Sequence, residues 1–273
     1  IGLGATANVF LGQVEAPLLI KPYLSAMTRH ELLIIMTVGM STIAGSVMVV
    51  YTTMLSPIYG AGLIGHFLSA SLISVPAGIM YANMMIPSDI KTEFPENKSD
   101  DLYSSTMDAI TQGTKNGLDM FLNISAMLIV VMALVFLLNA ILGLLPNFND
   151  TPVSLELILG YIFVPLAWFM GIPWSESLMA GQLLGVKTAL NEFVAYLYLS
   201  DTDTYALSDK SRLIMLYALC GFANFSSVGI LLSGLSAMVP ERRKDLISVS
   251  GKALWGALLA SCLTGYMVGI LHS

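Results

Sequence analysis

Two long apolar segments of this chain are each interrupted near the middle by amide and carboxylate side chains. Segment Ile1–Leu24 contains the run Gly12-Gln13-Val14-Glu15, and segment Trp174–Leu199 is broken from Gly185 through Asn191-Glu192. A carboxylate at such depth is costly in lipid, and irregular backbone at membrane depth is tolerated only in protein or beside water. We therefore expect each segment to form a re-entrant helical hairpin, and this constrains the fold more than any other feature.

Five further apolar runs are long enough to cross a bilayer, which takes about 20 residues in a helix. Two of them carry polar interruptions, at Ser41–Ser46 and at Gly221–Ser227, which predict helices that are unwound at their centres. With 56% hydrophobic and only 11% charged residues, the chain has too little charge to cover a soluble surface. We expect a membrane protein in a lipid bilayer, with spans at Leu32–Leu55, Ala61–Ile86, Met120–Leu145, Leu213–Val239 and Leu246–Leu271.

The order of hairpin, broken span and span occurs twice. Glu15 and Glu192 are separated by nearly the same number of residues as Ser46 and Ser227, and one uninterrupted span lies between the two copies, so the copies have opposite orientations. We expect an all-α membrane protein built as an inverted repeat of re-entrant helical hairpin, broken transmembrane helix and transmembrane helix. Its expected parts are a first repeat (1–86), a cytoplasmic loop with an interfacial segment (87–117), a single transmembrane helix (118–146) and a second repeat (147–273), which begins with an interfacial helix at Leu155–Met170.

The distribution of basic residues predicts the orientation, because cytoplasmic loops collect Lys and Arg. Lys210 and Arg212 fall on one side of the predicted topology, and the opposite side holds Lys21, Arg29, Lys91, Lys98, Lys115, Arg242, Arg243, Lys244 and Lys252. The latter side is therefore expected to be cytoplasmic, with the C-terminus extracytoplasmic, in the inner or plasma membrane. The chain starts abruptly at Ile1 without a basic start or signal peptide, so we expect it to be the later part of a longer protein.

An inverted repeat with paired broken helices is typical of a secondary transporter whose site lies where the breaks meet. Uncharged polar residues gather at the breaks and suit a neutral polar solute or a desolvated cation: Asn8, Gln13, Thr42, Asn191, Asn224, Ser226 and Ser227. Lys187 is expected to snorkel or to pair with a carboxylate. The net charge of −6 argues against nucleic-acid binding.

An alternative from another class is an intramembrane enzyme that uses Glu15 and Glu192 as acid and base. The sequence shows no nucleophile–base pair and no cofactor signature. His30-Glu31 begins like a zinc-hydrolase helix but has Ile34 where the second His is required. We therefore predict that the protein is not an enzyme and has no organic cofactor.

Three motifs in order resemble those of the concentrative nucleoside transporters. They are the run from Gly12 to Leu18 (GQVEAPL), the run from Asn191 to Tyr196 (NEFVAY) and the run from Gly221 to Ser227 (GFANFSS). The likeness covers essentially the whole chain, and family members carry further membrane helices upstream.

The resemblance implies the following site residues. Gln13 and Glu15 would hydrogen-bond a nucleobase, with Val47 and Phe222 packed around it, and Val14 stands where the family often has a Thr hydroxyl. The ribose hydroxyls would be held by Glu192, Asn224 and Ser227. A sodium ion would be bound by the Asn8 side chain, the Thr42 hydroxyl and the carbonyls of Leu11 and Ile43.

The resemblance further implies a sodium-coupled nucleoside symporter that forms a homotrimer. Its two repeats (1–86 and 147–273) would form a transport domain that moves across the bilayer as a body against a scaffold that includes the transmembrane helix at 118–146, in an elevator motion. An alternative within transport is a proton-coupled relative, in which Glu15 or Glu192 titrates and no sodium site forms.

Overall fold

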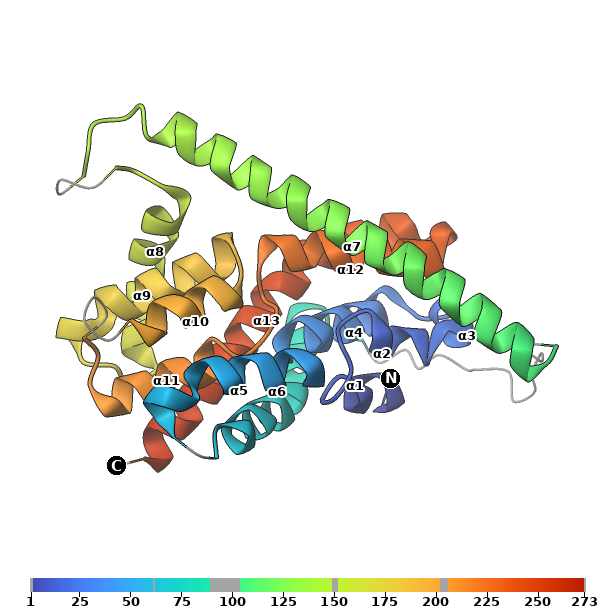
Figure 1. Cartoon of the computed structure of the whole chain (residues 1–273), viewed down its shortest axis with the longest axis horizontal. Coiled ribbons are helices and arrows are strands. Elements are labelled where there is room, and N and C mark those ends of the chain that lie inside the picture. The colour runs from blue at the N-terminus through green and yellow to red at the C-terminus, as the bar shows by residue number, and fades with distance from the viewer. Residues whose placement is uncertain (1, 61, 89–103, 149–151, 202–205, 273) are drawn as a thin grey trace.

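The computed structural model describes residues 2–60, 62–88, 104–148, 152–201 and 206–272, apart from the side chains of residues 116, 120, 123 and 124. This part of the chain is built from helices, in an order that confirms the predicted all-α inverted repeat (Figure 1). The first repeat comprises a hairpin of α1 (Gly2–Ala7), α2 (Glu15–Leu18) and α3 (Lys21–Leu24), a broken helix of α4 (Arg29–Ser41) and α5 (Gly45–Tyr59), and α6 (Leu63–Met85).

The second repeat has the same order of parts. After α8 (Leu155–Phe169) come a hairpin of α9 (Trp174–Ala189) and α10 (Glu192–Ser200), a broken helix of α11 (Asp209–Ala218) and α12 (Phe225–Met238), and α13 (Arg243–Leu271), which follows a 3-10 turn at Pro240–Arg242. Between the repeats lies α7 (Thr106–Leu142).

Two asparagines restart the helices of the second repeat after its chain breaks. The Asn191 Oδ1 atom accepts a hydrogen bond from the Val194 N–H at 3.0 Å at the start of α10, and the Asn224 Oδ1 atom accepts one from the Ser227 N–H at 2.7 Å at the start of α12. Both asparagines have extended backbone and satisfy orphan N–H groups of the following half-helix, as N-cap residues do. The polar residues in these apolar runs therefore have a local structural cause.

The two broken helices meet at their breaks. The Phe222 N–H donates to the Thr42 carbonyl at 3.3 Å. Gly221 has a φ of +135°, and a Cβ atom there would lie 2.7 Å from the Ser41 carbonyl oxygen. Only glycine adopts this backbone and permits this approach without strain, so Gly221 allows the crossing of the two repeats.

Within the described residues, four helical stretches are long and apolar enough to cross a membrane: Arg29–Tyr59, which includes the break, Leu63–Met85, Ser125–Leu142 and Pro240–Leu271. The predicted span Leu213–Val239 lies on two shorter helices, α11 and α12. The predicted span Met120–Leu145 belongs to a longer helix that starts at Thr106, so the end of the predicted 87–117 loop is helical. The rest of that loop includes residues 89–103, which lie outside the described residues.

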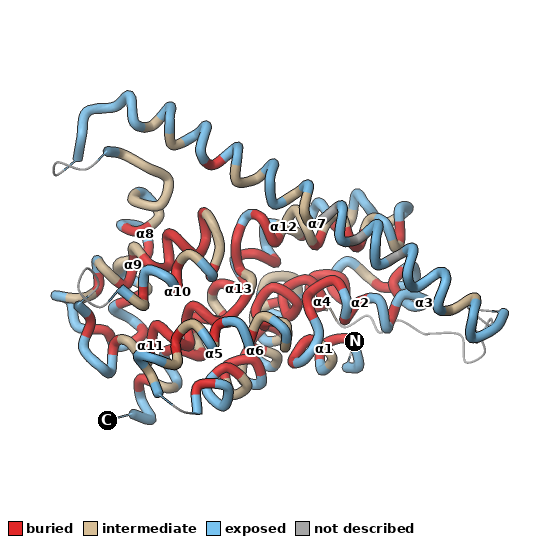
Figure 2. Tube along the Cα trace, viewed as in Figure 1, coloured by how far each residue is buried: buried red, intermediate tan, exposed pale blue. Residues whose placement is uncertain are grey.

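Helix α7 lies along one face of the molecule and packs mainly on α12 (Figure 1). Only 6% of its spanning stretch, Ser125–Leu142, is buried, in contrast to the densely buried α4, α11 and α13 (Figure 2). The core of the molecule thus lies between the two repeats, where α13 packs against α4, α6 and α11.

The second hairpin differs from the sequence-based prediction, which placed its break from Gly185 through Glu192. The break in the second hairpin lies only at Leu190 and Asn191, and Gly185 lies inside α9. A Cβ atom on Gly185 would lie 2.5 Å from the Glu156 carbonyl oxygen, and one on Gly181 would lie 2.5 Å from the Gly160 carbonyl oxygen. These glycines therefore allow two helices to approach closely, as small residues do in membrane proteins.

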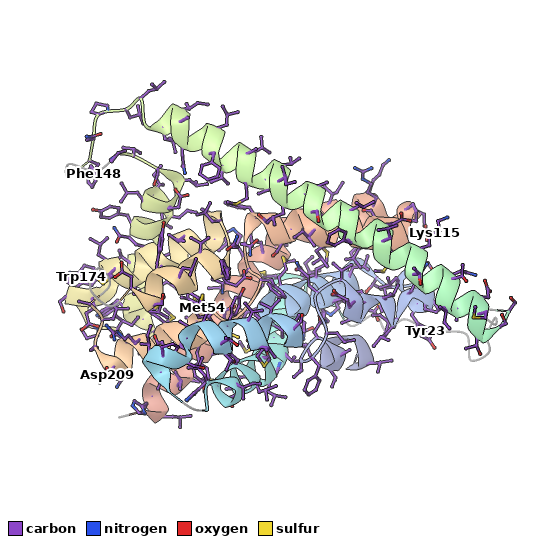
Figure 3. All side chains as sticks on the ribbon, in the orientation of Figure 1. Tyr23, Met54, Lys115, Phe148, Trp174 and Asp209 are labelled. Carbon is purple, nitrogen blue, oxygen red and sulfur yellow. The ribbon has the colours of Figure 1, made fainter. Side chains whose placement is uncertain are left out.

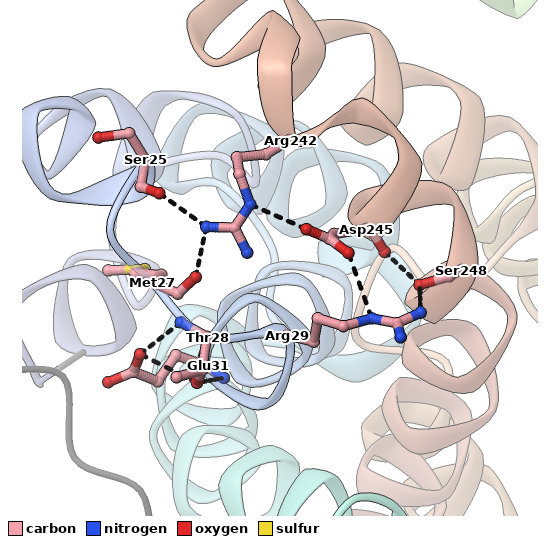
Figure 4. Close-up of polar contacts among 8 residues, drawn as sticks. All are labelled: Ser25, Met27, Thr28, Arg29, Glu31, Arg242, Asp245 and Ser248. Carbon is pink, nitrogen blue, oxygen red and sulfur yellow. Dashed lines mark hydrogen bonds and ion pairs between the residues drawn. The ribbon is translucent and has the colours of Figure 1, made fainter.

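A charged cluster ties the end of the first hairpin to the start of α13 (Figure 4). The Arg242 Nη1 atom donates to the Ser25 carbonyl at 2.7 Å and also to the Met27 carbonyl, while its Nε atom donates to Asp245 at 2.9 Å. The Nε atom of Arg29 lies 3.3 Å from the other Asp245 oxygen. The cluster lies on the side that the basic residues predict to be cytoplasmic.

The labelled side chains show the two ends of the molecule (Figure 3). Tyr23 and Lys115 lie toward one end of the long axis, and Trp174 and Asp209 lie toward the other. The mouth of the first hairpin and the start of α7 are therefore at the opposite end from the mouth of the second hairpin.

Candidate functional site

A cavity of about 460 Å³ opens where both hairpin tips meet both broken helices. All eight residues predicted to bind substrate line it: Gln13, Val14, Glu15, Val47, Glu192, Phe222, Asn224 and Ser227. The remaining lining residues come from the same chain breaks and from α7, α10 and α12: Gly12, Ala44, Ser46, Leu128, Asn191, Phe193, Ser226 and Ile230. The fold thus brings together residues from five separate parts of the sequence.

The carboxylate of Glu192 is held by two hydrogen bonds. The Tyr51 hydroxyl donates to Oε1 at 2.8 Å, and the Asn224 Nδ2 atom donates to Oε2 at 2.9 Å. Glu192 is 5% exposed and is the first residue of α10, where the helix dipole favours negative charge. A buried carboxylate is stabilised here by specific donors and by a helix N-terminus.

The orientation of the Asn224 amide follows from its second role as an N-cap. Its Oδ1 atom accepts from the Ser227 N–H, so its Nδ2 atom is left to face Glu192. The same break that unwinds the helix therefore fixes a donor beside the carboxylate.

Several cavity groups have unused hydrogen-bonding capacity. The Gln13 Oε1 and Ser226 Oγ atoms are buried and make no hydrogen bond within the described part of the protein. Buried polar groups in proteins are usually paired, so these two atoms lack the partner that such groups normally have. The apolar Val47 and Phe222 side chains also line the cavity and suit a flat apolar surface.

The first hairpin tip is fitted to its surroundings by two glycines. The Glu15 carboxylate lies over Gly12, where a Cβ atom would be 2.1 Å from Oε2. Val14 is 1% exposed and packs on Gly234, where a Cβ atom would be 2.4 Å from the Val14 Cγ1 atom.

The predicted sodium ligands come from two segments in direct contact. The Gly45 N–H donates to the Phe10 carbonyl at 2.9 Å, which joins the first hairpin turn, containing Asn8 and Leu11, to the break that contains Thr42 and Ile43.

The donor set of this region fits a sodium ion. The Asn8 Oδ1 atom is buried without a hydrogen-bond partner, and the Thr42 hydroxyl donates to the Val38 carbonyl at 3.1 Å, which leaves its lone pairs free. In the described part of the chain, no group of three or more His, Cys, Asp or Glu residues could hold a metal ion. A site of amide, hydroxyl and carbonyl oxygens at an unwound helix suits a monovalent cation.

Two residues have contacts that the sequence did not predict. Lys187 is fully buried and its Nζ atom donates to the Ala218 carbonyl at 2.9 Å, so it neither snorkels nor has a carboxylate as its hydrogen-bond partner. Tyr51 contacts Glu192 although 141 residues separate them. The one sequence signal that could have linked Tyr51 to the site is its position on α5, the helix that also carries the predicted substrate residue Val47.

These features define a membrane carrier with an inverted repeat and a polar site between two chain breaks. A family model described as "Na+ dependent nucleoside transporter C-terminus" matches residues 66–269. The chain belongs to this family of concentrative nucleoside transporters, which are transport proteins and not enzymes.

Curated relatives match along nearly the whole chain. It is 38% identical to human solute carrier family 28 member 3, over 98% of this chain and 41% of that protein, and 36% identical to the nucleoside permease NupC of Helicobacter pylori, over 98% and 64%. An uncharacterized transporter of Bacillus subtilis, YutK, is 39% identical over 98% of this chain and 66% of its own length. The chain thus spans two thirds or less of these relatives.

Solved structures share the fold. CNTnw in an inward-facing substrate-bound state is 36% identical with a TM-score of 0.78, over 98% of this chain and 63% of that one. The CNTnw N149S, F366A variant in an outward-facing state is 34% identical with a TM-score of 0.86, over 99% of this chain and 64% of that one.

Proposed function

We propose that this protein imports nucleosides by symport with sodium across the inner or plasma membrane. The observation that carries the proposal is the meeting of all eight predicted substrate residues in one cavity between the breaks of the two repeats. Family membership supports the same conclusion.

The proposed binding mode follows from the groups in the cavity. Gln13 and Glu15 from the first hairpin hydrogen-bond the edge of the base, which packs between Val47 and Phe222. The carboxylate of Glu192 accepts hydrogen bonds from ribose hydroxyls, while Asn224 and Ser227 complete the sugar site. None of these contacts requires a fixed counter-charge on the solute.

Sodium is proposed as the coupling ion. It is held by the Asn8 and Thr42 side chains and by the Leu11 and Ile43 carbonyls. Because Gln13 follows directly on this turn, an ion there orders the first hairpin tip and thereby the base site. By linkage, sodium then raises nucleoside affinity by the same factor by which nucleoside raises sodium affinity.

Transport is proposed to follow an elevator motion in a homotrimer, with the cytoplasmic side at the basic end and the C-terminus outside. The apolar and largely exposed face of α7 suits a scaffold helix that packs against other parts of the assembly. The two repeats would move past it as one body, since alternating access in repeat-built carriers is largely rigid-body.

Uptake into proteoliposomes tests the function. Radiolabelled uridine and adenosine are expected to accumulate unchanged when an inward sodium gradient is imposed, and not without it. Accumulation that follows a pH gradient and ignores sodium would favour the proton-coupled alternative, while chemically altered product would favour an enzyme.

Cysteine labelling tests the motion separately. Cys220 and Cys262 are both buried and free, and are first replaced by Ala. Phe193→Cys on α10 is expected to react with membrane-impermeant reagents from either side, depending on sodium and nucleoside, whereas Ala133→Cys on α7 is expected to keep one pattern. Labelling of Phe193→Cys from one side only, while transport proceeds, would favour gating around a stationary site.

A further inference from the structure

The buried Tyr51 side chain connects the first repeat to the substrate cavity through Glu192. Tyr51 is 2% exposed and does not line the cavity, yet its hydroxyl donates to the Glu192 carboxylate at 2.8 Å. Its ring packs against Tyr196, with a centroid distance of 4.9 Å, and against Phe67, at 6.1 Å. Tyr51 is therefore a rigid donor whose position is set by an aromatic cluster.

We propose that Tyr51 is a positioning residue that fixes the Glu192 carboxylate for recognition of the sugar hydroxyls. This inference rests on the proposed nucleoside site and adds to it a residue that touches no substrate.

The argument starts from the hydrogen-bonding capacity of a carboxylate. An ionised carboxylate has about four lone-pair sites, two on each oxygen. Tyr51 occupies one site on Oε1 and Asn224 one on Oε2. Even with the Glu192 backbone N–H as a further donor, the carboxylate keeps acceptor capacity that hydroxyls of a furanose ring can use.

Both donors are needed to hold this arrangement. Asn224 constrains Oε2, because its amide is oriented by its N-cap bond to Ser227. Without the Tyr51 hydroxyl the carboxylate can turn about its terminal torsion, which is broad for glutamate. Loss of the hydroxyl should therefore weaken recognition of the hydroxyl pair more than recognition of the base.

The two donors also come from different repeats. Tyr51 is on α5 of the first repeat, whereas Glu192 and Asn224 belong to the second. The sugar site is therefore complete only when α5 of the first repeat is packed on the second hairpin.

The test compares Tyr51→Phe with Tyr196→Phe. Tyr196 lies in the same aromatic cluster and is equally buried, but its hydroxyl donates to the Leu216 carbonyl at 2.8 Å rather than to Glu192. Both changes keep the ring and remove one buried hydroxyl. Binding of uridine, 2′-deoxyuridine and 3′-deoxyuridine is measured at saturating sodium for the parent and each variant.

We expect Tyr51→Phe to weaken uridine binding about tenfold, as for other coupled neighbouring groups. Each deoxy analogue lacks one of the two hydroxyls that Glu192 is proposed to bind, so each should lose less affinity than uridine, about threefold. In a Glu192→Gln background the Tyr51→Phe change should add little, whereas Tyr196→Phe should act equally on all three ligands. Equal losses for all ligands with Tyr51→Phe, or additive effects with Glu192→Gln, would overturn the proposal.

A second measurement keeps the hydroxyl in place. With 3-fluorotyrosine at position 51, the ¹⁹F resonance should shift when uridine binds, and should not shift on adding uracil. A resonance that responds equally to uracil would contradict a role in sugar recognition. If the parent binds neither uridine nor the analogues, the proposed function fails and this inference fails with it; normal parent binding with unchanged selectivity in Tyr51→Phe removes only the inference.

Discussion

Replacement of Glu192 by Gln tests the sugar site directly, because Gln keeps the size of the side chain and removes its charge. The Asn224 amide must keep its Nδ2 atom toward position 192, since its Oδ1 atom accepts from the Ser227 N–H. A Gln oxygen would therefore face Asn224, and its NH₂ group would face Tyr51, whose hydroxyl can rotate to accept. Asn224 thus keeps its acceptor, while the Tyr51 hydroxyl keeps one hydrogen bond and loses the acceptor of its own proton.

The substitution Glu192→Gln then weakens the hydrogen bonds that residue 192 makes to the solute. On the Asn224 side, a charged acceptor becomes a neutral one, and on the Tyr51 side the acceptor becomes a donor. Hydrogen bonds to charged groups contribute about 1.5–3 kcal/mol, compared with about 0.5–1.5 kcal/mol for neutral ones. We expect nucleoside binding to weaken by about 1.5–3 kcal/mol, which is roughly ten- to hundredfold.

Equilibrium binding of radiolabelled uridine at saturating sodium measures this loss. Glu176→Gln is the matched control, because its carboxylate accepts from the Ser208 N–H at 3.2 Å and hydroxyl at 3.0 Å, on an exposed surface away from the cavity. The control should keep parent affinity. Near-parent affinity of Glu192→Gln would remove Glu192 from the binding site and refute the reasoning.

Three further changes test the sodium ligands and the packing of the second repeat. Asn8→Ala should raise the sodium concentration for half-maximal uptake severalfold, with a smaller effect on uridine affinity at saturating sodium; equal effects on both would contradict a role as ion ligand. Lys187→Met should lower stability by about 1–3 kcal/mol, because it leaves the buried Ala218 carbonyl without its donor; an unchanged thermal unfolding temperature would show that the contact contributes nothing. Gly185→Ala should destabilise the protein by about 1–3 kcal/mol, since its Cβ atom would meet backbone at 2.5 Å, whereas Gly113→Ala, with nothing within 4 Å, should be nearly neutral.

The overall fold could be predicted because its signals are local. Gln13, Glu15 and Glu192 interrupt apolar runs, and each interruption lies at or beside a turn or break in the structure. Gly185 was misassigned because a glycine in an apolar run has two uses: it can end a helix, or it can let another helix approach. Which use applies depends on α8, a neighbour that local sequence does not identify.

The candidate site could be predicted only in part. The eight predicted residues share a cavity because each lies on or close to a chain break, but the roles given to them remain predictions. Tyr51 was missed because a tyrosine in an apolar helix has no local feature that separates packing from hydrogen bonding. The partner of Lys187 was missed for a similar reason, because every residue has a carbonyl and only the three-dimensional fold selects that of Ala218.

The contacts between the repeats also bear on how the protein can move. Each repeat donates a hydrogen bond to the other. The Phe222 N–H donates to the Thr42 carbonyl, and the Tyr51 hydroxyl donates to the Glu192 carboxylate. Separating the repeats would leave the buried Glu192 carboxylate without one of its donors, and loss of a hydrogen bond to a buried charged group is destabilising. Moving both repeats together would keep these contacts and would change the packing on α7, which includes hydrogen bonds between Asn139 and Glu156 as well as apolar contacts. The hydrogen bonds that join the repeats are therefore consistent with the proposed motion of both repeats as one body.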